Sequence, residues 1–311
     1  MSINTKVLLL GGFGMLGTSI KKYLVKNKIN FTSPPKKNLN LLNKREINNF
    51  IAKKKFTHVI NAAGLVGGIL SNINRNTEFF EKNLEMNYNL INAAYRHEIP
   101  NFFNIGSSCM YPKIYHRPMS ENYLFSGPLE ETNFGYALAK LNAAYYLKMK
   151  RDQESNLNYC TFIPPNLYGP YDNFDLNSSH LIASIVRKVI DAKKNNKKEL
   201  IIWGTGKAKR EFLHVDDVGC YIAKLTKKNF NFPSFLNIGS FRDLTVNQYY
   251  KKTMEAINLK AKLIYDLTKP EGMKRKLMNS NLAKQKYSWK PKIPLDKGLI
   301  EVIKFYKKSY V

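Results

Sequence analysis

The sequence lacks long apolar runs and has little cysteine, and both shortages exclude classes of protein. No stretch of about 18 or more apolar residues occurs, so we expect no segment that spans a membrane. The three cysteines, Cys109, Cys160 and Cys220, are odd in number and widely spaced, which argues against a disulfide framework and against a zinc site. The first apolar run, residues 7–10, is too short for a signal peptide. We therefore expect a cytoplasmic protein without a metal site.

Acidic residues are also scarce, since 23 Asp and Glu stand against 50 Lys and Arg and give a formal net charge of +27. A nucleic-acid-binding protein is one interpretation of this imbalance. However, nine of the 50 basic residues are arginine, and the lysines are spread along the chain with no nucleic-acid-binding motif beside them. We therefore favour a lysine-rich enzyme without a nucleic-acid partner, in which the charge attracts anionic nucleotides as a modest by-product.

Strand-like and helix-like segments alternate over the first half of the chain. We expect strands at 6–10, 29–33, 58–61, 101–106 and 159–163, and helices at 17–26, 44–54, 77–98 and 136–151. This rhythm predicts an α/β fold with a Rossmann-type doubly wound parallel sheet. After Pro164 the pattern changes to loops, a helix near 181–194 and short elements, which indicates a smaller C-terminal lobe packed on the first domain.

A glycine-rich turn, Gly-Gly-Phe-Gly-Met-Leu-Gly at 11–17, follows the first expected strand and opens the first expected helix. Glycine permits a tight turn and a close approach of the backbone to a pyrophosphate. The helix N-terminus then offers free N–H groups and the positive end of its dipole. A purely structural turn is the alternative, but the order strand, turn, helix favours a dinucleotide site.

The end of the second expected strand lacks the acidic residue that would hold the ribose 2′-hydroxyl of NAD. The segment 33–37 reads Ser-Pro-Pro-Lys-Lys instead. Two ammonium groups suit a 2′-phosphate, which a carboxylate would repel. The sequence therefore indicates NADP, unless Lys36 and Lys37 are simply two more surface lysines.

A set of residues suited to hydride transfer lies in the middle of the chain. Tyr136 and Lys140 are one helical turn apart on the same face, so the ammonium can stabilise the phenolate and let the tyrosine exchange a proton near neutral pH. Ser107 follows the strand expected at 101–106, and its hydroxyl can bond the same substrate carbonyl. Tyr136 could instead be an ordinary buried aromatic residue, but the combination with the glycine turn favours chemistry.

Together these features resemble the extended short-chain dehydrogenase/reductases, and further motifs narrow the resemblance to the GDP-L-fucose synthase family. That family epimerises GDP-4-keto-6-deoxy-mannose at C3 and C5 and then reduces C4 with NADPH. The resemblance implies the same activity, a GDP-sugar substrate and a homodimer. It runs over nearly the whole chain and is carried by Gly-Ser-Ser-Cys-Met-Tyr-Pro at 106–112, Asn-Leu-Tyr-Gly-Pro-Tyr-Asp-Asn-Phe at 166–174, Ser-His at 179–180, Trp-Gly-Thr-Gly at 203–206, Arg-Glu-Phe-Leu-His-Val-Asp-Asp at 210–217 and Lys-Pro-Glu-Gly-Met-Lys-Arg-Lys at 269–276.

Inversion at C3 and C5 needs a base on one face of the sugar and an acid on the other. Cysteine and histidine have reference pKa values of about 8.5 and 6.5, which suit proton shuttling. We expect Cys109 as the base, and the resemblance puts His180 across the ring as the acid. The alternatives are a small buried thiol at Cys109 and, at His180, the start of a helix capped by a serine. His214 also lies in a motif but looks structural.

The resemblance also implies a division of the chain. We expect an NADP-binding domain at 1–165, completed by about 212–240, and a nucleotide-sugar lobe at 166–211 and 241–311. The expected catalytic residues are Ser107, Cys109, Tyr136, Lys140 and His180. The expected cofactor site comprises Gly11, Phe13, Gly14, Met15, Leu16, Gly17, Lys36, Lys37, Asn40, Leu41, Ala62, Ala63, Gly64, Tyr136, Lys140, Pro164, Asn166, Leu167 and His180. The expected substrate residues are Ser108, Asn166, Lys188, Trp203, Arg210, Arg275 and Lys276.

The chain departs from the family pattern at three binding positions. Phe13 occupies the glycine turn where an arginine is common, and Lys36 and Lys188 also stand in place of arginine. These changes leave room for a related sugar, such as a GDP-4-keto-heptose, and for an enzyme that only reduces or only epimerises. A non-catalytic dinucleotide sensor would instead require a damaged Ser-Tyr-Lys set, and this chain keeps all three residues.

Overall fold

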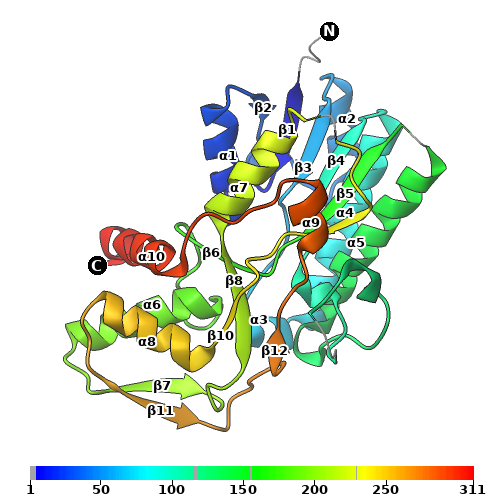
Figure 1. The fold of residues 1–311 in the computed structure, drawn as a ribbon. Helices are drawn as coiled ribbons and strands as arrows, with labels where there is room; N and C mark the ends of the chain where they lie inside the picture. Colours follow the sequence, from blue (N-terminus) through cyan, green and yellow to red (C-terminus); the bar gives the residue numbers. More distant parts are fainter. Residues whose placement is uncertain (1–4, 115–117, 155, 229) are drawn as a thin grey trace.

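A six-stranded parallel sheet forms the centre of the molecule, in the order β2-β1-β3-β4-β5-β9 (Figure 1). The computed structural model describes residues 5–114, 118–154, 156–228 and 230–311. The strand order reverses between β1 and β3, and such sheets bind ligands at the carboxyl ends of the strands at that point. The Rossmann-type doubly wound α/β fold is therefore confirmed. The strands are β1 Lys6–Leu10, β2 Asn30–Thr32, β3 His58–Asn61, β4 Asn101–Ile105, β5 Asn158–Ile163 and β9 Phe235–Asn237.

Helices cover both faces of this sheet because side chains alternate along its buried strands. Val7 and Leu9 of β1 enter the core cluster that includes residues of α1 and α7. Leu8 and Leu10 point the other way, into the cluster shared with α2, α4 and α5. Burying each such side chain contributes roughly 1.5–3 kcal/mol. The helices are α1 Met15–Lys26 and α7 Val215–Leu225 on one face, and α2 Lys44–Ala52, α4 Asn76–Arg96 and α5 Phe134–Gln153 on the other.

The second lobe lies below the large sheet in Figure 1 and has a core of its own. Its sheet has the order β10-β8-β12, with β6 also paired to β8, and a separate parallel pair joins β7 and β11. Three helices bury their apolar faces against these strands. The elements are β6 Asn166–Tyr168, β7 Glu199–Trp203, β8 Lys209–His214, β10 Asp243–Thr245, β11 Lys262–Asp266, β12 Arg275–Lys276, α6 Leu181–Lys194, α8 Val246–Ala256 and α10 Leu295–Tyr310.

Short helices occupy several of the connections between these larger elements. They are α3 Ile69–Asn74, α9 Asn281–Lys286 and the 3-10 helices η1 Lys36–Asn38, η2 Ser108–Met110, η3 Glu121–Tyr123 and η4 Glu131–Asn133. The expected strands and helices of the first half all form, with ends that differ by at most two residues. In the part of the chain that the structure describes, none of the helices combines the length and the hydrophobicity that crossing a bilayer requires.

Candidate active site

The glycine turn sits at the point where the strand order reverses. Gly11 has φ +74°, a conformation that favours glycine, and a Cβ there would come within 2.5 Å of the Ala62 backbone after β3. A Cβ on Gly17 would overlap the carbonyl oxygen of Gly11. Helix α1 begins at Met15, and Gly14 before it provides no side-chain cap, so the N–H groups of the first turn remain for an anion. Gly11, Gly14, Gly17, Ala62 and Ala63 thus form one backbone cradle.

The residues expected at the adenosine ribose follow the end of β2. Lys36 and Lys37 begin the exposed helix η1. The Ser33 hydroxyl is buried beside Gly12 and has no hydrogen-bond partner among the described residues. Phe13 is exposed, and the Lys21 ammonium lies 3.8 Å above its ring centroid. An ammonium group therefore stands beside the glycine turn, even though the turn has phenylalanine in place of arginine.

The structure brings Ser107, Tyr136 and Lys140 together. Burial and the neighbouring Cys109 raise the pKa of Tyr136, while a hydrogen bond with the Ser107 side chain lowers it. Lys140 is buried, donates to the Ile105 carbonyl at 2.9 Å, and has its pKa lowered by burial to about 8. Its ammonium lies 6.0 Å from the Tyr136 ring centroid. Among the described side chains burial dominates, so the pKa of Tyr136 lies above its ordinary value.

Cys109 lies in η2 beside this set and is half-buried. Its backbone N–H donates to Ser107 Oγ at 3.2 Å. Two side chains donate to its sulfur: Asn133 Nδ2 at 3.2 Å and Lys276 Nζ at 3.5 Å. An ammonium and an amide aimed at one sulfur stabilise negative charge there. Lys276, which the sequence assigned to the substrate, therefore contacts the expected base directly.

His180 caps the N-terminus of α6 with its backbone, and its ring reaches the loop after β6. His180 Nδ1 lies 3.5 Å from Asp172 Oδ1. Burial lowers the pKa of His180, but the hydrogen bond and the charge of Asp172 outweigh it and raise the pKa above its ordinary value. The Ser179 hydroxyl is buried and bonds nothing within the described parts of the chain, so the serine-cap alternative is wrong.

The loop after β3 lies against both Lys140 and the segment before His180. A Cβ on Gly64 would lie 3.5 Å from the Lys140 ammonium. Four residues later, Gly68 donates its N–H to the Ser178 carbonyl at 2.8 Å, and a Cβ on Gly68 would overlap the Ser179 carbonyl. This loop therefore fixes the segment before His180 against the domain that contains Lys140.

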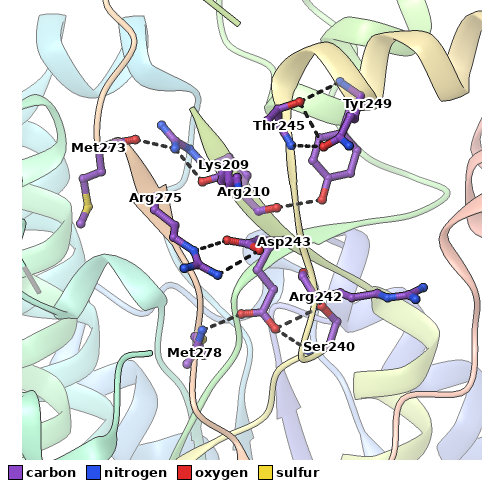
Figure 2. Close-up of polar contacts among 12 residues, drawn as sticks. Lys209, Arg210, Ser240, Arg242, Asp243, Thr245, Tyr249, Met273, Arg275 and Met278 are labelled. Carbon is purple, nitrogen blue, oxygen red and sulfur yellow. Dashed lines mark hydrogen bonds and ion pairs between the residues drawn. The ribbon is translucent and has the colours of Figure 1, made fainter. Parts of the chain in front are cut away.

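Two of the basic residues expected at the nucleotide sugar, Arg210 on β8 and Arg275 on β12, are shown in Figure 2. Arg210 donates to the backbone carbonyls of Lys209, Glu271 and Met273 at 2.9, 2.8 and 2.5 Å, so it fastens the segment 271–273 to β8. Arg275 faces Lys209 across the β8–β12 pair, and its side chain forms an ion pair with Asp243 at 2.5 Å. The guanidinium groups of Arg210 and Arg275 are thus both engaged within the protein.

The other expected binding residues are placed as follows. The Lys188 ammonium donates to the Ile201 carbonyl at 3.2 Å and lies 5.6 Å from the Trp203 ring, which brings these two residues together. Asn166 donates to the Glu211 carbonyl at 3.2 Å. Ser108 is buried and donates its N–H to the Pro164 carbonyl at 3.1 Å, and Leu167 packs against the sheet core. Asn40, exposed after η1, donates its N–H to Glu46 Oε1 at 2.9 Å beside Leu41.

Three polar residues of this region were missed by sequence reasoning. Asn133 and Asp172 contact Cys109 and His180 respectively, and Glu211 has a fully buried carboxyl group. Glu211 accepts from the N–H groups of Ser240, Phe241 and Met278 at 2.5, 3.0 and 2.8 Å. Asp172 and Glu211 lie inside motifs that the sequence displays. Their partners are remote in the chain or in a loop, so a linear pattern does not identify them.

His214 is structural, as its position suggested. It caps α7, and its Nδ1 accepts from the Asp216 N–H at 3.3 Å. Burial lowers its pKa to about 4, so the ring is neutral at pH 7.

Comparison with known proteins agrees with this geometry. Residues 7–239 match the sequence model of the NAD dependent epimerase/dehydratase family. The chain belongs to this family. A GDP-L-colitose synthase of Yersinia pseudotuberculosis is 37% identical over 301 residues, which cover 97% of each chain. A GDP-L-fucose synthase of Azorhizobium caulinodans is 34% identical over 309 residues, covering 98% of this chain and 97% of that protein. The resemblance to GDP-L-fucose synthases is therefore confirmed.

A solved structure extends the likeness to three dimensions. A GDP-D-glycero-L-gluco-heptose synthase from Campylobacter jejuni, crystallised in the presence of NADPH, superposes with a TM-score of 0.88 at 26% identity and covers 99% of both chains. The family member described here thus shares its complete architecture, including the second lobe, with a nucleotide-sugar enzyme.

Proposed function

We propose that this chain is an NADPH-dependent 3,5-epimerase and 4-reductase of a GDP-4-keto-6-deoxy sugar, and that it converts GDP-4-keto-6-deoxy-D-mannose to GDP-L-fucose. One observation carries the proposal. The Ser107 hydroxyl accepts the backbone N–H of Cys109 and is hydrogen-bonded to Tyr136, so the residues that carry a thiol and a phenol flank one serine. A proton-abstracting group and a proton-donating group around one carbonyl are what epimerisation followed by reduction requires.

The residues around the sheet reversal fit NADP. Gly11 and Gly17 leave the space that a pyrophosphate needs, and the first turn of α1 offers its N–H groups. The Ser33 hydroxyl, Lys36 and Lys37 supply donors and positive charge for a 2′-phosphate. Asn40, Leu41 and Gly64 would complete the walls of the same site. When bound, NADPH supplies the hydride that reduces C4.

In the epimerisation, the 4-keto group acidifies the protons at C3 and C5. Cys109 removes a proton on one face, and His180 returns one on the other. The negative charge that develops on the keto oxygen accepts hydrogen bonds from Ser107 and Tyr136. Asn133 and Lys276 hold the sulfur of Cys109 in place and stabilise it as an anion.

In the reduction, Tyr136 donates its phenolic proton to the C4 oxygen as hydride arrives at carbon. Burial raises the pKa of Tyr136, so the phenol carries its proton at neutral pH and has it available for transfer. Lys140 lies one helical turn from Tyr136 and is held by its hydrogen bond to the Ile105 carbonyl. Its ammonium stabilises the phenolate that remains. The same pair of oxyanion donors thus serves both reactions.

The second lobe would hold the GDP portion. Lys188 and Trp203 lie side by side and suit a phosphate and a base, while Arg210, Arg275 and Lys276 line adjacent strands. We accordingly assign cofactor binding to 1–165 with 212–240, and the nucleotide sugar to 166–211 with 241–311. Ser108 and Asn166 stand at the boundary between them.

The decisive test follows the sugar in D₂O. Purified enzyme is incubated with GDP-4-keto-6-deoxy-mannose, with and without NADPH. The nicotinamide absorbance reports reduction, while mass spectrometry and NMR report deuterium in the sugar. We expect deuterium at C3 and C5, consumption of NADPH and formation of GDP-L-fucose. NADPH consumption without deuterium uptake would show a reductase only and would remove the roles given to Cys109 and His180.

A related GDP-4-keto sugar, such as a heptose, is the second candidate. The likeness to a GDP-heptose synthase over 99% of both chains favours it, as does Lys188 at a substrate position where the family often has arginine. The same assay with a GDP-4-keto-heptose distinguishes the candidates by the ratio of kcat/KM.

The proposal includes a cytoplasmic homodimer. Tyr88 of α4 and Met149 of α5 expose 50% and 60% of their surface on neighbouring helices, which supports a dimer face there. Light scattering on the purified protein and fractionation of the cells that produce it test these two points.

A further inference from the structure

We propose that Asp172 is the positioning residue of His180: its carboxylate orients the imidazole through Nδ1, so that Nε2 faces the sugar. This inference rests on the acid role given to His180 in the proposed function. The supporting distance is 3.5 Å between His180 Nδ1 and Asp172 Oδ1.

The two side chains differ in exposure in the way this arrangement requires. Asp172 exposes 5% of its side chain, whereas His180 exposes 37%. The carboxylate therefore lies behind the ring and is shielded from substrate, while the ring has an open side. With Nδ1 engaged by the carboxylate, Nε2 is the nitrogen left for proton transfer.

The carboxylate needs a positive partner. Asp172 Oδ1 accepts the N–H of Asn173 at 2.8 Å, but Oδ2 is buried and has no hydrogen-bond partner in the described part of the chain. A buried carboxylate with one unsatisfied oxygen is costly unless a cation lies beside it. The ring of His180, when it is protonated, supplies that cation, and the same attraction raises the pKa of His180.

The backbone turns Asp172 inward. Tyr171 has φ +68°, an unfavourable conformation for a non-glycine residue, and its ring is exposed and contacts Phe305 of α10 at 4.7 Å between centroids. On the other side, Phe174 is buried and its carbonyl accepts from Arg187 of α6 at 3.0 Å. Side chains on both flanks thus hold a strained turn, which is common at functional sites.

Other charged groups near this pair are engaged elsewhere. Arg187 also pairs with Asp191 on α6 at 3.6 Å. The Asp175 carboxylate accepts from the Asn177 N–H and the Ser178 hydroxyl at 2.9 and 3.2 Å. From α10, aromatic side chains face the loop. Asp172 is therefore the charged group that acts on His180 among the described residues.

Within the reaction, Asp172 exchanges no proton with the sugar. His180 loses the proton on Nε2 to the sugar carbon, the electron pair of the enolate forms the new C–H bond, and the ring regains a proton from water. Loss of Asp172 would therefore slow proton delivery without removing the proton donor.

The test uses Asp172→Asn, which keeps the shape and removes the charge. Asp175→Asn is the matched control, because it changes an exposed carboxyl three residues away in the same loop. NMR of ¹⁵N- and ¹³C-labelled histidine follows the titration and tautomer of His180, assigned with His180→Asn. We expect Nδ1–H in the neutral ring of the wild type, a lower titration midpoint in Asp172→Asn and no change in Asp175→Asn.

Activity provides the second readout. In Asp172→Asn we expect deuterium uptake at saturating sugar to fall at least about tenfold. The decline of uptake on the alkaline side should begin at a lower pH than in the wild type. NADPH affinity should stay unchanged. An unchanged His180 titration in Asp172→Asn, or a neutral wild-type ring protonated on Nε2, would overturn the inference even if the proposed function stands. Absence of deuterium uptake in the wild type would instead overturn the acid role of His180. If Asp172→Asn does not fold, the tautomer of the neutral His180 ring in the wild type still tests whether Asp172 pairs with Nδ1.

Discussion

The sulfur of Cys109 receives contacts from two side chains that lie far from it in the sequence. Asn133 is 24 residues away and Lys276 is 167 residues away. Lys276 is largely buried, so its ammonium is constrained near the sulfur and cannot act as a freely moving surface charge. At the scale of single residues, the second lobe therefore supplies part of the environment of the proposed base.

Replacing Lys276 with methionine tests that contact. Lys276→Met keeps the approximate length of the side chain and removes its charge. A neutral neighbour would no longer stabilise the thiolate, so we expect deuterium uptake at saturating sugar to fall by about 10- to 100-fold. NADPH affinity should stay unchanged. Lys274→Met, at an exposed position two residues earlier, is the control. A higher KM with an unchanged maximal uptake would restore Lys276 to the substrate role that the sequence indicated.

Glu211 makes a prediction about stability. Burial raises the pKa of its carboxyl from 4.5 to about 7, against the lowering effect of N–H groups from Met278, Ser240 and Phe241. The folded state then binds a proton that the unfolded state has lost. The contribution of Glu211 to the free energy of unfolding should be complete below about pH 4.5 and should decline as the pH rises to about 7.

The measurement compares urea unfolding of the wild type and Glu211→Gln between pH 4.5 and 8. Glutamine does not titrate, so we expect the wild type to lose stability relative to Glu211→Gln as the pH rises through this window. Above the window, the difference between their unfolding free energies should level off. Glu255→Gln, at an exposed position on α8, should give a difference independent of pH. A pH-independent difference for Glu211→Gln would contradict the buried, protonated carboxyl.

At the scale of elements, the glycine turn links strand, helix and cofactor cradle. Gly17→Ala would place a Cβ against the carbonyl of Gly11, and we expect this to reduce the free energy of unfolding by about 1–3 kcal/mol. Gly14→Ala is the control, because its Cβ would meet the same oxygen at an ordinary 3.6 Å. Chemical unfolding without cofactor measures both, and equal losses would show that the close approach at Gly17 is unimportant.

Elements with a repeating pattern were predictable from sequence, and contacts between elements were not. The apolar runs and the 3.6-residue periodicity of the first half produced the strands and helices where expected, because burial on one or both faces imposes those periods. The six-residue α3 and the four 3-10 helices are too short to show a period. The Tyr136–Lys140 pair is visible because both residues share one helix, whereas Asn133–Cys109 and Asp172–His180 depend on loop geometry.

At the scale of the whole molecule, the charge of +27 remains to be related to function. A uniform positive field would attract every nucleotide ligand, while a local cluster would recognise one phosphate. The two cases differ in range, since charges farther apart than about 8–10 Å are largely screened at physiological salt. Because the exposed Lys36 and Lys37 are placed by the fold near the end of β2, we favour local recognition of the 2′-phosphate.

Measuring NADPH and NADH affinities at several salt concentrations separates these cases. We expect NADPH affinity to fall more steeply with salt, and we expect Lys36→Met with Lys37→Met to remove most of the difference between the cofactors. Lys307→Met with Lys308→Met removes the same charge from α10, at the far end of the chain, and should leave that difference in place. If both double variants weaken NADPH binding equally, then the field of the whole lysine-rich surface, and not the two lysines after β2, selects the phosphorylated cofactor.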